Sequence, residues 1–522
     1  MEQHDTQTGS PLDHPISNDS ATTEDTSKKP LGLMDATFLV AGSMIGSGIF
    51  LVTSDMARDL GSSGWLLVTW LLTGVITLFG ALSYGELAAM FPKAGGQFVY
   101  IKEAWGKLPS FLYGWTVFTV IQTGVIAAVG VAFGKFLGVF FPILVEKTLF
   151  SYASVKINGA NVVGAFIILL LTLLNTRGIQ YGKIVQAIFT SSKLIALLVL
   201  IVAGIAVGIS SGYFGENFTD MWDATKTTIK ENPTTGVITV TGIMDLLPIG
   251  LAIAISTTII NSLFSSDAWN NVTFIAGDIR HPERNLPRSL FLGTFIVTVL
   301  YILANVAYLG LLPLEGVPQA PDVGYTRDAV EAAGIQFASS GRVGTSAAFM
   351  LFGNIANILM AILIMISTFG CNNGLIMAGS RLFYAMSKEG LFFRKATAVN
   401  RFGVPAWAMW AQGIWAILLC FSGSYNILIK FATFGSMVFY IVTIAGLFKL
   451  RRTMPNASRP YKAFGYPVVP FLYLVFAFLI CVSLTVFTFE DTAGSILLVI
   501  LGIPVYYLFF HKKQQQRQTE AG

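Results

Sequence analysis

The stretch that decides the fold is AGSMIGSGIF, residues 41–50, which lies within the first hydrophobic segment of the chain. Gly46, Ser47 and Gly48 stand at its centre, where a membrane-spanning helix would ordinarily carry leucine or alanine. Glycine is a poor helix former and leaves backbone groups exposed. In hydrocarbon such groups find no water, so a broken helix is tolerated only where it faces protein or a wet cavity. The stretch therefore indicates either a backbone binding site at membrane depth or close helix packing through small residues.

The composition places the chain in a lipid bilayer. Of its 522 residues, 54% are hydrophobic and 12% are charged, whereas soluble domains carry about 25% charged residues. A net charge of +5 is too small to indicate nucleic acid binding. The cysteines lie in apolar segments, and the four histidines lie in tails or a loop without ligand spacing. We therefore expect a membrane protein that is not an enzyme and has no metal site and no cofactor.

Twelve apolar segments of roughly spanning length follow a polar tail, residues 1–30, which has the composition of a disordered segment. They are expected at 31–57, 64–91, 107–141, 160–176, 182–209, 245–279, 287–312, 343–388, 404–421, 425–448, 466–489 and 493–510. The pattern predicts an all-α membrane protein with twelve transmembrane helices. The third and eighth segments exceed one crossing, so we expect them to be tilted or to continue beyond the membrane.

Lysine and arginine gather in the connections that this count places on one side, which predicts that both termini are cytoplasmic and that the protein lies in the cell membrane. Residues 511–522 then form a cytoplasmic tail. The longest outer connections are 210–244 and 313–342. Residues 236–242 alternate threonine with valine or isoleucine, which favours a small β-hairpin in the first of them.

The first and sixth segments start from opposite sides of the membrane, so two five-helix halves would have inverted topology. That arrangement predicts a second break in the sixth segment, and NSLFSSDAWNN at 261–271 provides one. Such a polar run is costly at membrane depth unless it faces a cavity; the alternative is a loop misplaced inside the segment. We expect a transporter core over 31–448, followed by the last two helices with their preceding cytoplasmic loop over 449–510.

Motifs in a fixed order connect the chain to a known family. They are GSMIGSGIF at 42–50, YGEL at 84–87, FPKAGG at 91–96, YIKEAWG at 100–106, LFSSDAWN at 263–270, NLPR at 285–288, SRLF at 380–383 and RPYK at 459–462. Together, over about residues 31–510, they resemble the amino acid–polyamine–organocation superfamily and its L-type amino acid transporter branch. The resemblance implies two inverted five-helix repeats of the leucine-transporter type plus two C-terminal helices. It also implies amino acid transport by alternating access.

The resemblance assigns roles to the two breaks. The turn at 47–49 would bind the substrate carboxylate, the carbonyl of Met44 would bind the amino group, and Phe264 would close over the substrate. The expected substrate-binding residues are Met44, Ile45, Gly46, Ser47, Gly48, Ile49, Phe264, Ser265, Ser266 and Asp267. These roles are physically sensible, because a helix N-terminus favours an anion and freed carbonyls favour an ammonium group.

Two deep charges are candidates for gating or coupling, together with Phe264. Lys193 matches a lysine that the family carries where sodium-coupled relatives bind sodium, and we expect carbonyls of the broken first helix to hold it. A structural buried pair is the alternative. Asp267 could sense the amino group or a proton, or it could cap the second half of its helix.

Other charges and departures from the family pattern complete the expectations. Glu86 and Glu103 are expected to pair with Lys93, Lys102 or Arg288 as a gate or brace. Trp269 is expected to pack the second break, and the phenylalanines at 431, 434 and 439 to belong to the core. Ser266 and Ala268 replace an aromatic residue and a glycine of the family, which leaves the extent of that break open. No cysteine occurs between 141 and 160, so no disulfide-linked partner subunit is expected.

The sequence therefore predicts a secondary active transporter of neutral L-amino acids. Sodium-independent exchange and proton-coupled uptake both remain open. The alternatives are a sodium-coupled symporter, and a channel or transceptor of the same fold. Two polar breaks suit one midplane site better than the repeated polar lining of a channel.

Overall fold

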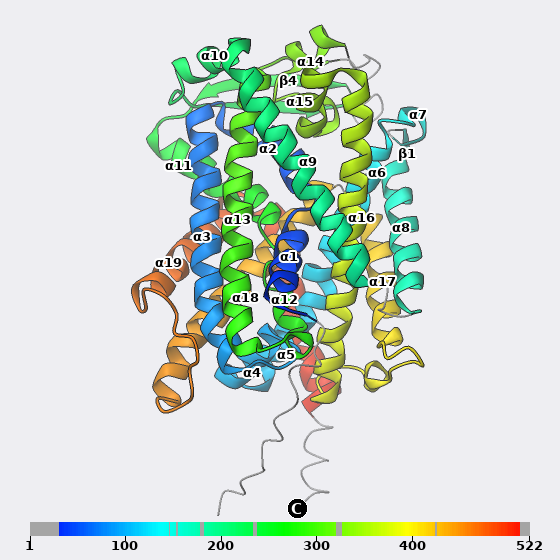
Figure 1. The fold of residues 1–522 in the computed structure, drawn as a ribbon, viewed down its shortest axis with the longest axis vertical. Helices are drawn as coiled ribbons and strands as arrows, with labels where there is room; N and C mark the ends of the chain where they lie inside the picture. The colour runs from blue at the N-terminus through cyan, green and yellow to red at the C-terminus, as the bar shows by residue number, and fades with distance from the viewer. Residues whose placement is uncertain are drawn as a thin grey trace, which may run out of the picture.

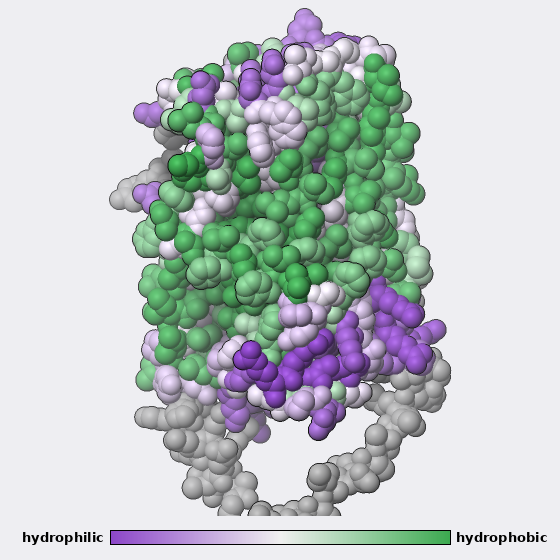
Figure 2. Space-filling view, turned by 90° about the vertical axis from the view of Figure 1, so that its left-hand side faces the viewer, coloured by the Kyte–Doolittle hydropathy of each residue, from purple (hydrophilic) through white to green (hydrophobic). Residues whose placement is uncertain are grey.

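The computed structural model describes residues 31–145, 147–152, 155–177, 182–232, 237–319, 326–422 and 425–511. In this part of the chain nine helices are long and apolar enough to cross a membrane, or ten if one bent pair counts as a single span. Three shorter apolar helices accompany them. On the face shown in Figure 2, a broad apolar band lies between more polar ends, as expected of a multi-pass membrane protein.

The helices of the first half are α1 (Leu33–Met44), α2 (Gly48–Leu60), α3 (Ser63–Met90), α4 (Gln97–Trp105), α5 (Lys107–Thr116), η2 (Val117–Ile121), α6 (Gln122–Leu137), α7 (Pro142–Val145), α8 (Gly159–Asn175), α9 (Gly182–Ser211) and α10 (Tyr213–Thr219). Those of the second half are α11 (Pro248–Ser265), α12 (Asn271–Phe274), η3 (Ala276–Asp278), α13 (Pro282–Leu311), α14 (Arg327–Ala333), η4 (Ser339–Gly341), α15 (Val343–Phe352), α16 (Asn354–Lys388), η5 (Arg394–Thr397), α17 (Ala406–Cys420), α18 (Tyr425–Thr453), α19 (Val468–Phe487), α20 (Phe489–Val505) and η6 (Tyr506–His511).

The strands form two antiparallel hairpins. β1 (Thr148–Tyr152) pairs with β2 (Val155–Asn158), and β3 (Thr225–Glu231) pairs with β4 (Ile238–Asp245). The second hairpin lies in the connection where alternating residues favoured one. The alternating stretch contributes to only one of its strands, β4, and the partner strand β3 lies earlier in the chain.

Both predicted breaks are present. α1 ends at Met44, α2 begins at Gly48, and the two helices are bent by 41°. α11 ends at Ser265, and residues 266–270 are not helical before α12 begins. Ala268 takes a left-handed conformation with φ of +65°, which glycine adopts readily and alanine does not. The second break is therefore present although alanine stands where the family pattern has glycine.

The eighth expected segment, 343–388, is wrong as a single helix. Gly353 has φ of +67° and separates α15 from α16. A left-handed residue cannot continue a right-handed helix, so the chain turns there. The third expected segment remains one span over Lys107–Leu137, with the π-helical turn η2 in its middle.

The broken helix α1–α2 lies inside the bundle. α9 and α13 lie beside α1, and α11 packs against α2. In Figure 1 β4, α10 and α14 gather at one end of the long axis and α4 and α5 at the other. The buried core is continuous across α1, α3, α6, α13 and α16, so both breaks are enclosed by protein at mid-height.

Candidate functional site

The two helix breaks face each other. A Cβ placed on Gly48 would lie 2.2 Å from the Oγ of Ser265 and 2.8 Å from its Cα. The buried hydroxyl of Tyr301, on α13, lies 2.9 Å from the carbonyl oxygen of Met44 and 3.1 Å from that of Ser265. A hydroxyl has one proton, so the two carbonyls share it. Tyr301 thus ties the breaks together, a role that the sequence analysis missed; its only signal was a tyrosine within an apolar span.

The start of α2 is a site suited to an anion. Its first N–H groups have no carbonyl partners within the helix, and the helix dipole makes this end positive. Ser47 precedes the helix but makes no capping bond to its backbone. Its Oγ lies 3.2 Å from the hydroxyl of Tyr425, the first residue of α18. The serine side chain is thus engaged by Tyr425, and the first N–H groups of α2 remain the groups suited to a carboxylate.

The end of α1 is held by side chains from other helices. The ammonium group of Lys193, on α9, donates to the carbonyl of Gly42 at 3.1 Å and to that of Ile45 at 3.0 Å. Lys193 is only 3% exposed, and the carbonyl partners expected for it are confirmed. Ser367 donates to the same Ile45 carbonyl at 3.2 Å. The freed backbone is thus satisfied by a fixed cation and a hydroxyl, as buried backbone requires.

Asp267 lies in the second break and is partly buried. One carboxylate oxygen accepts the hydroxyl of Tyr440 at 2.5 Å, and the other accepts that of Ser436 at 3.1 Å. Both partners are on α18. The residue that caps α12 is Asn270, without a side-chain capping bond, so Asp267 does not cap the second half of the helix.

Two cavities adjoin Asp267. One is lined by Gln97, Tyr113, Gln122 and Asn271 among others, and the other by Thr77, Leu263, Trp269 and Tyr473 among others. Asp267, Ser436 and Tyr440 line both. Neither cavity is lined by residues 46–49. The carboxylate of Asp267 therefore borders both cavities, whereas residues 46–49 at the start of α2 are not part of either lining.

Phe264, Ser265, Ser266 and Trp269, at or beside the second break, are buried. Phe264 meets the ring of Tyr425 edge-on, with centroids 6.0 Å apart. Ser265 donates to the carbonyl of Asn261, and the backbone N–H of Ser266 bonds within the last turn of α11. Trp269 contacts the rings of Tyr84 and Tyr440 at centroid distances of 4.8 and 5.3 Å, which confirms its packing role.

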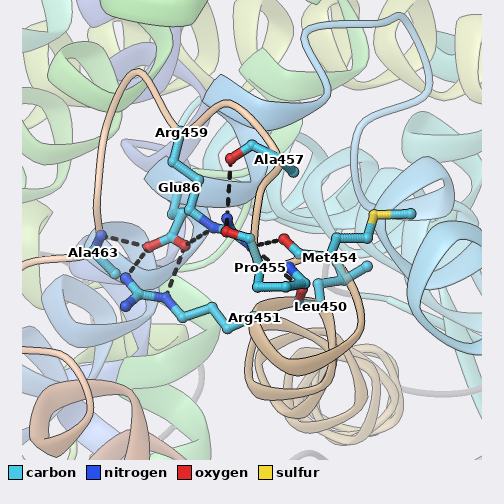
Figure 3. A network of polar contacts seen from close by, with 8 residues as sticks. All are labelled: Glu86, Leu450, Arg451, Met454, Pro455, Ala457, Arg459 and Ala463. Carbon is cyan, nitrogen blue, oxygen red and sulfur yellow. Dashed lines mark hydrogen bonds and ion pairs between the residues drawn. The ribbon is translucent and has the colours of Figure 1, made fainter.

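Glu86 has partners other than those expected. Its carboxylate accepts bonds from Arg451, Arg459 and the backbone N–H of Ala463 (Figure 3). Lys102 instead pairs with Glu389 at 2.8 Å. The prediction for Glu86 was wrong because its true partners lie some 370 residues away, at the end of α18 and in the loop that follows. The cluster braces α3 against α18 at the end of the molecule that carries α4 and α5.

In the described residues, no group of three or more His, Cys, Asp or Glu could hold a metal ion. The two breaks offer groups that can recognise a charged molecule: the N–H groups at the start of α2, a cation on the α1 carbonyls and a partly buried carboxylate in the second break. A zwitterion of small size has complementary charges for this arrangement.

Comparisons with known proteins agree with this geometry. The model of the amino acid permease family matches residues 31–509. The chain is 28% identical to the b(0,+)-type amino acid transporter 1 of Mus musculus, over 93% of this chain and 89% of that protein. It is 29% identical to the serine/threonine exchanger SteT of Bacillus subtilis, over 92% and 96%. It is 30% identical to the large neutral amino acids transporter small subunit 2 of Homo sapiens, over 92% and 80%.

Proposed function

The chain belongs to the amino acid permease family and is an amino acid transporter of the membrane, and we propose that it exchanges neutral amino acids without sodium. One observation carries the sodium clause. The Lys193 ammonium group lies on the carbonyls of Gly42 and Ile45, so a fixed positive charge occupies the freed backbone of α1. A sodium ion there would meet electrostatic repulsion and occupied ligands.

The substrate's common backbone binds at the breaks. Its carboxylate binds the turn Ser47–Gly48–Ile49, supported by Gly46, and its amino group binds the carbonyls of Met44 and of Ser265 and Ser266. Tyr301 already shares its proton between two of these carbonyls, and each carbonyl retains a second lone pair for the ammonium group. Ile45 borders this binding site, with its carbonyl held by Lys193 and Ser367, and Phe264 covers the site.

Neutral side chains suit the site better than cationic ones. Asp267 is the acidic group in the second break, and its two oxygens already accept hydroxyls of Tyr440 and Ser436. A cationic side chain would have to displace these partners. We assign to Asp267, with Lys193 and Phe264, the gating and coupling of transport.

The fold behind this function is two inverted five-helix repeats and two further helices. Ten spans are long enough to cross the membrane when the bent pair α1–α2 counts as one. The shorter helices α8 and α17 cross as well, which gives twelve. The inverted pair of broken helices supports the repeat over 31–448, with α19 and α20 outside it. The distribution of lysine and arginine supports cytoplasmic termini and the cell membrane. Without a cysteine between 141 and 160, the protein acts without a disulfide-linked subunit.

The test is uptake into proteoliposomes loaded with unlabelled amino acids and offered a labelled panel outside. Sodium and pH are varied separately, with empty liposomes and unloaded proteoliposomes as controls. We expect uptake of neutral amino acids that needs internal amino acid and is equal in sodium and choline. Strict sodium dependence would contradict the exchange proposal in favour of a symporter. Uptake that follows a pH gradient without internal amino acid, and loses that dependence in Asp267→Asn, would assign proton coupling instead.

A further inference from the structure

We propose that Tyr425 is the outer gate of this transporter and that its hydrogen bond to Ser47 is the contact that breaks when the site opens outward. The inference rests on the proposed function, which places the substrate carboxylate at Ser47 and the start of α18 on the outer side. Tyr425 was not among the residues that the sequence singled out.

Three groups from three other elements hold the Tyr425 side chain. Its hydroxyl lies 3.2 Å from the Oγ of Ser47 at the start of α2. Its ring meets the edge of Phe264, at the end of α11, with an interplanar angle of 89°. The ammonium group of Lys135, in the last turn of α6, lies 5.0 Å from the ring centroid. The tyrosine is 3% exposed.

These contacts join both helix breaks to the outer ends of two other helices. Ser47 belongs to the first break and Phe264 to the second, whereas Lys135 and Tyr425 lie at the ends of α6 and α18. The side chain therefore covers the proposed carboxylate site. An amino acid arriving from outside reaches Ser47 only after the Tyr425 hydroxyl has left it.

The strength of the contacts fits a gate. A single hydrogen bond between neutral hydroxyls and one cation–π contact are each weak in net terms. They can hold a closed conformation and still break in each transport cycle. In contrast, Glu86 is held by two guanidinium groups and a backbone N–H, which suits a permanent brace.

The experiment uses the full chain and its native Cys371, which lies beside the first break with its Sγ 3.5 Å from the carbonyl of Ser43. Cys420 and Cys481 are replaced by alanine, so that Cys371 is the sole thiol of the chain. A membrane-impermeant maleimide is applied to intact cells without added substrate. Loss of one ordinary hydrogen bond shifts a two-state equilibrium about fivefold, and we expect Tyr425→Phe to speed outside labelling by about that factor.

Two further variants make the comparison specific. Lys135→Gln keeps the tyrosine hydroxyl and removes the cation over the ring, and we expect a smaller acceleration. Tyr384→Phe removes a hydroxyl at the other end of the molecule, where the ring contacts Lys388, and should leave labelling unchanged. Equal labelling of Tyr425→Phe and the parent, including no labelling of either, would overturn the gate.

Labelling of inside-out vesicles separates a gate from general loosening. An outer gate accelerates labelling from outside alone, so an equal acceleration from both faces would also overturn the proposal. Because labelling needs no substrate, it can fail or succeed independently of transport. If Tyr425→Phe is labelled faster from outside but the parent takes up no amino acid, the gate proposal stands and the proposed function is rejected.

Discussion

The Nζ of Lys193 lies 3.0 Å from the carbonyl oxygen of Ile45, although the two residues are 148 positions apart in the chain. This bond and the one to Gly42 place a buried ammonium group on backbone that the break in α1 set free. The cation belongs to the protein, so it is present in every step of a transport cycle. We therefore expect transport to depend on this charge.

Lys193→Met keeps most of the unbranched side chain and removes its charge and both hydrogen bonds. Hydrogen bonds to charged groups contribute about 1.5–3 kcal/mol each, so we expect exchange in loaded proteoliposomes to fall at least about tenfold. Lys395→Met, at an exposed lysine of η5, is the control and should exchange normally. Wild-type exchange by Lys193→Met would show that the lysine is only structural.

Gly46 and Gly48 should differ in their tolerance of alanine. A Cβ on Gly48 would collide with Ser265, side chain and backbone alike, whereas a Cβ on Gly46 would meet only the Sγ of Cys371 at an ordinary 3.5 Å. Overpacking of this kind costs about 1–3 kcal/mol. We expect Gly48→Ala to lower the thermal midpoint and abolish exchange, and Gly46→Ala to keep its midpoint. Gly250→Ala, on α11, is the control substitution, because a Cβ added there would lie 3.6 Å from its nearest neighbour, an ordinary contact.

Ala268→Gly should stabilise the protein. Alanine in the left-handed region costs about 1–2 kcal/mol, and the greater freedom of glycine in the unfolded chain offsets part of that gain. We expect a net gain of about 0.5–1 kcal/mol, seen as a higher thermal midpoint in detergent. Ala206→Gly, on the exposed side of α9, should lose about 1 kcal/mol because its backbone is right-handed. If both variants lose stability equally, the strain at Ala268 is not real.

Glu86→Gln should be strongly destabilising. The carboxylate is fully buried, and its partners Arg451 and Arg459 have side chains that are 23% and 9% exposed. Removing one partner of a buried ion pair costs about 3–5 kcal/mol, because the remaining charges stay uncompensated. Glu389→Gln breaks the more exposed pair with Lys102 and should cost less than about 1 kcal/mol. Similar thermal midpoints for the two variants would contradict the bracing role of Glu86.

Much of the candidate site could be predicted from the sequence because its signals are local. Glycine and serine at 46–48 and a polar run at 261–271 interrupt apolar spans, and hydrocarbon permits few structures for such residues. Lys193 is a charge deep in an apolar span, so it required a polar partner, and the nearest freed carbonyls were those of the first break.

Partners distant in the chain could not be predicted in this way. Glu86 was assigned to nearby basic residues, yet Arg451 and Arg459 hold it from 365 and 373 positions away. The break at Gly353 was also missed, because a single glycine in a long apolar segment does not reveal its φ. Tyr301 and Tyr425 carried no signal beyond an aromatic ring in or beside an apolar span.

The sequence by itself determined that the chain crosses the membrane many times and where two of its helices break, because hydrophobicity and helix propensity act over neighbouring residues. Only the tertiary structure decided which groups satisfy the broken ends. Tyr301 lies 257 positions from Met44, and Tyr425 lies 378 from Ser47. Such pairs form because helices pack side by side, and packing depends on the whole bundle rather than on any one segment.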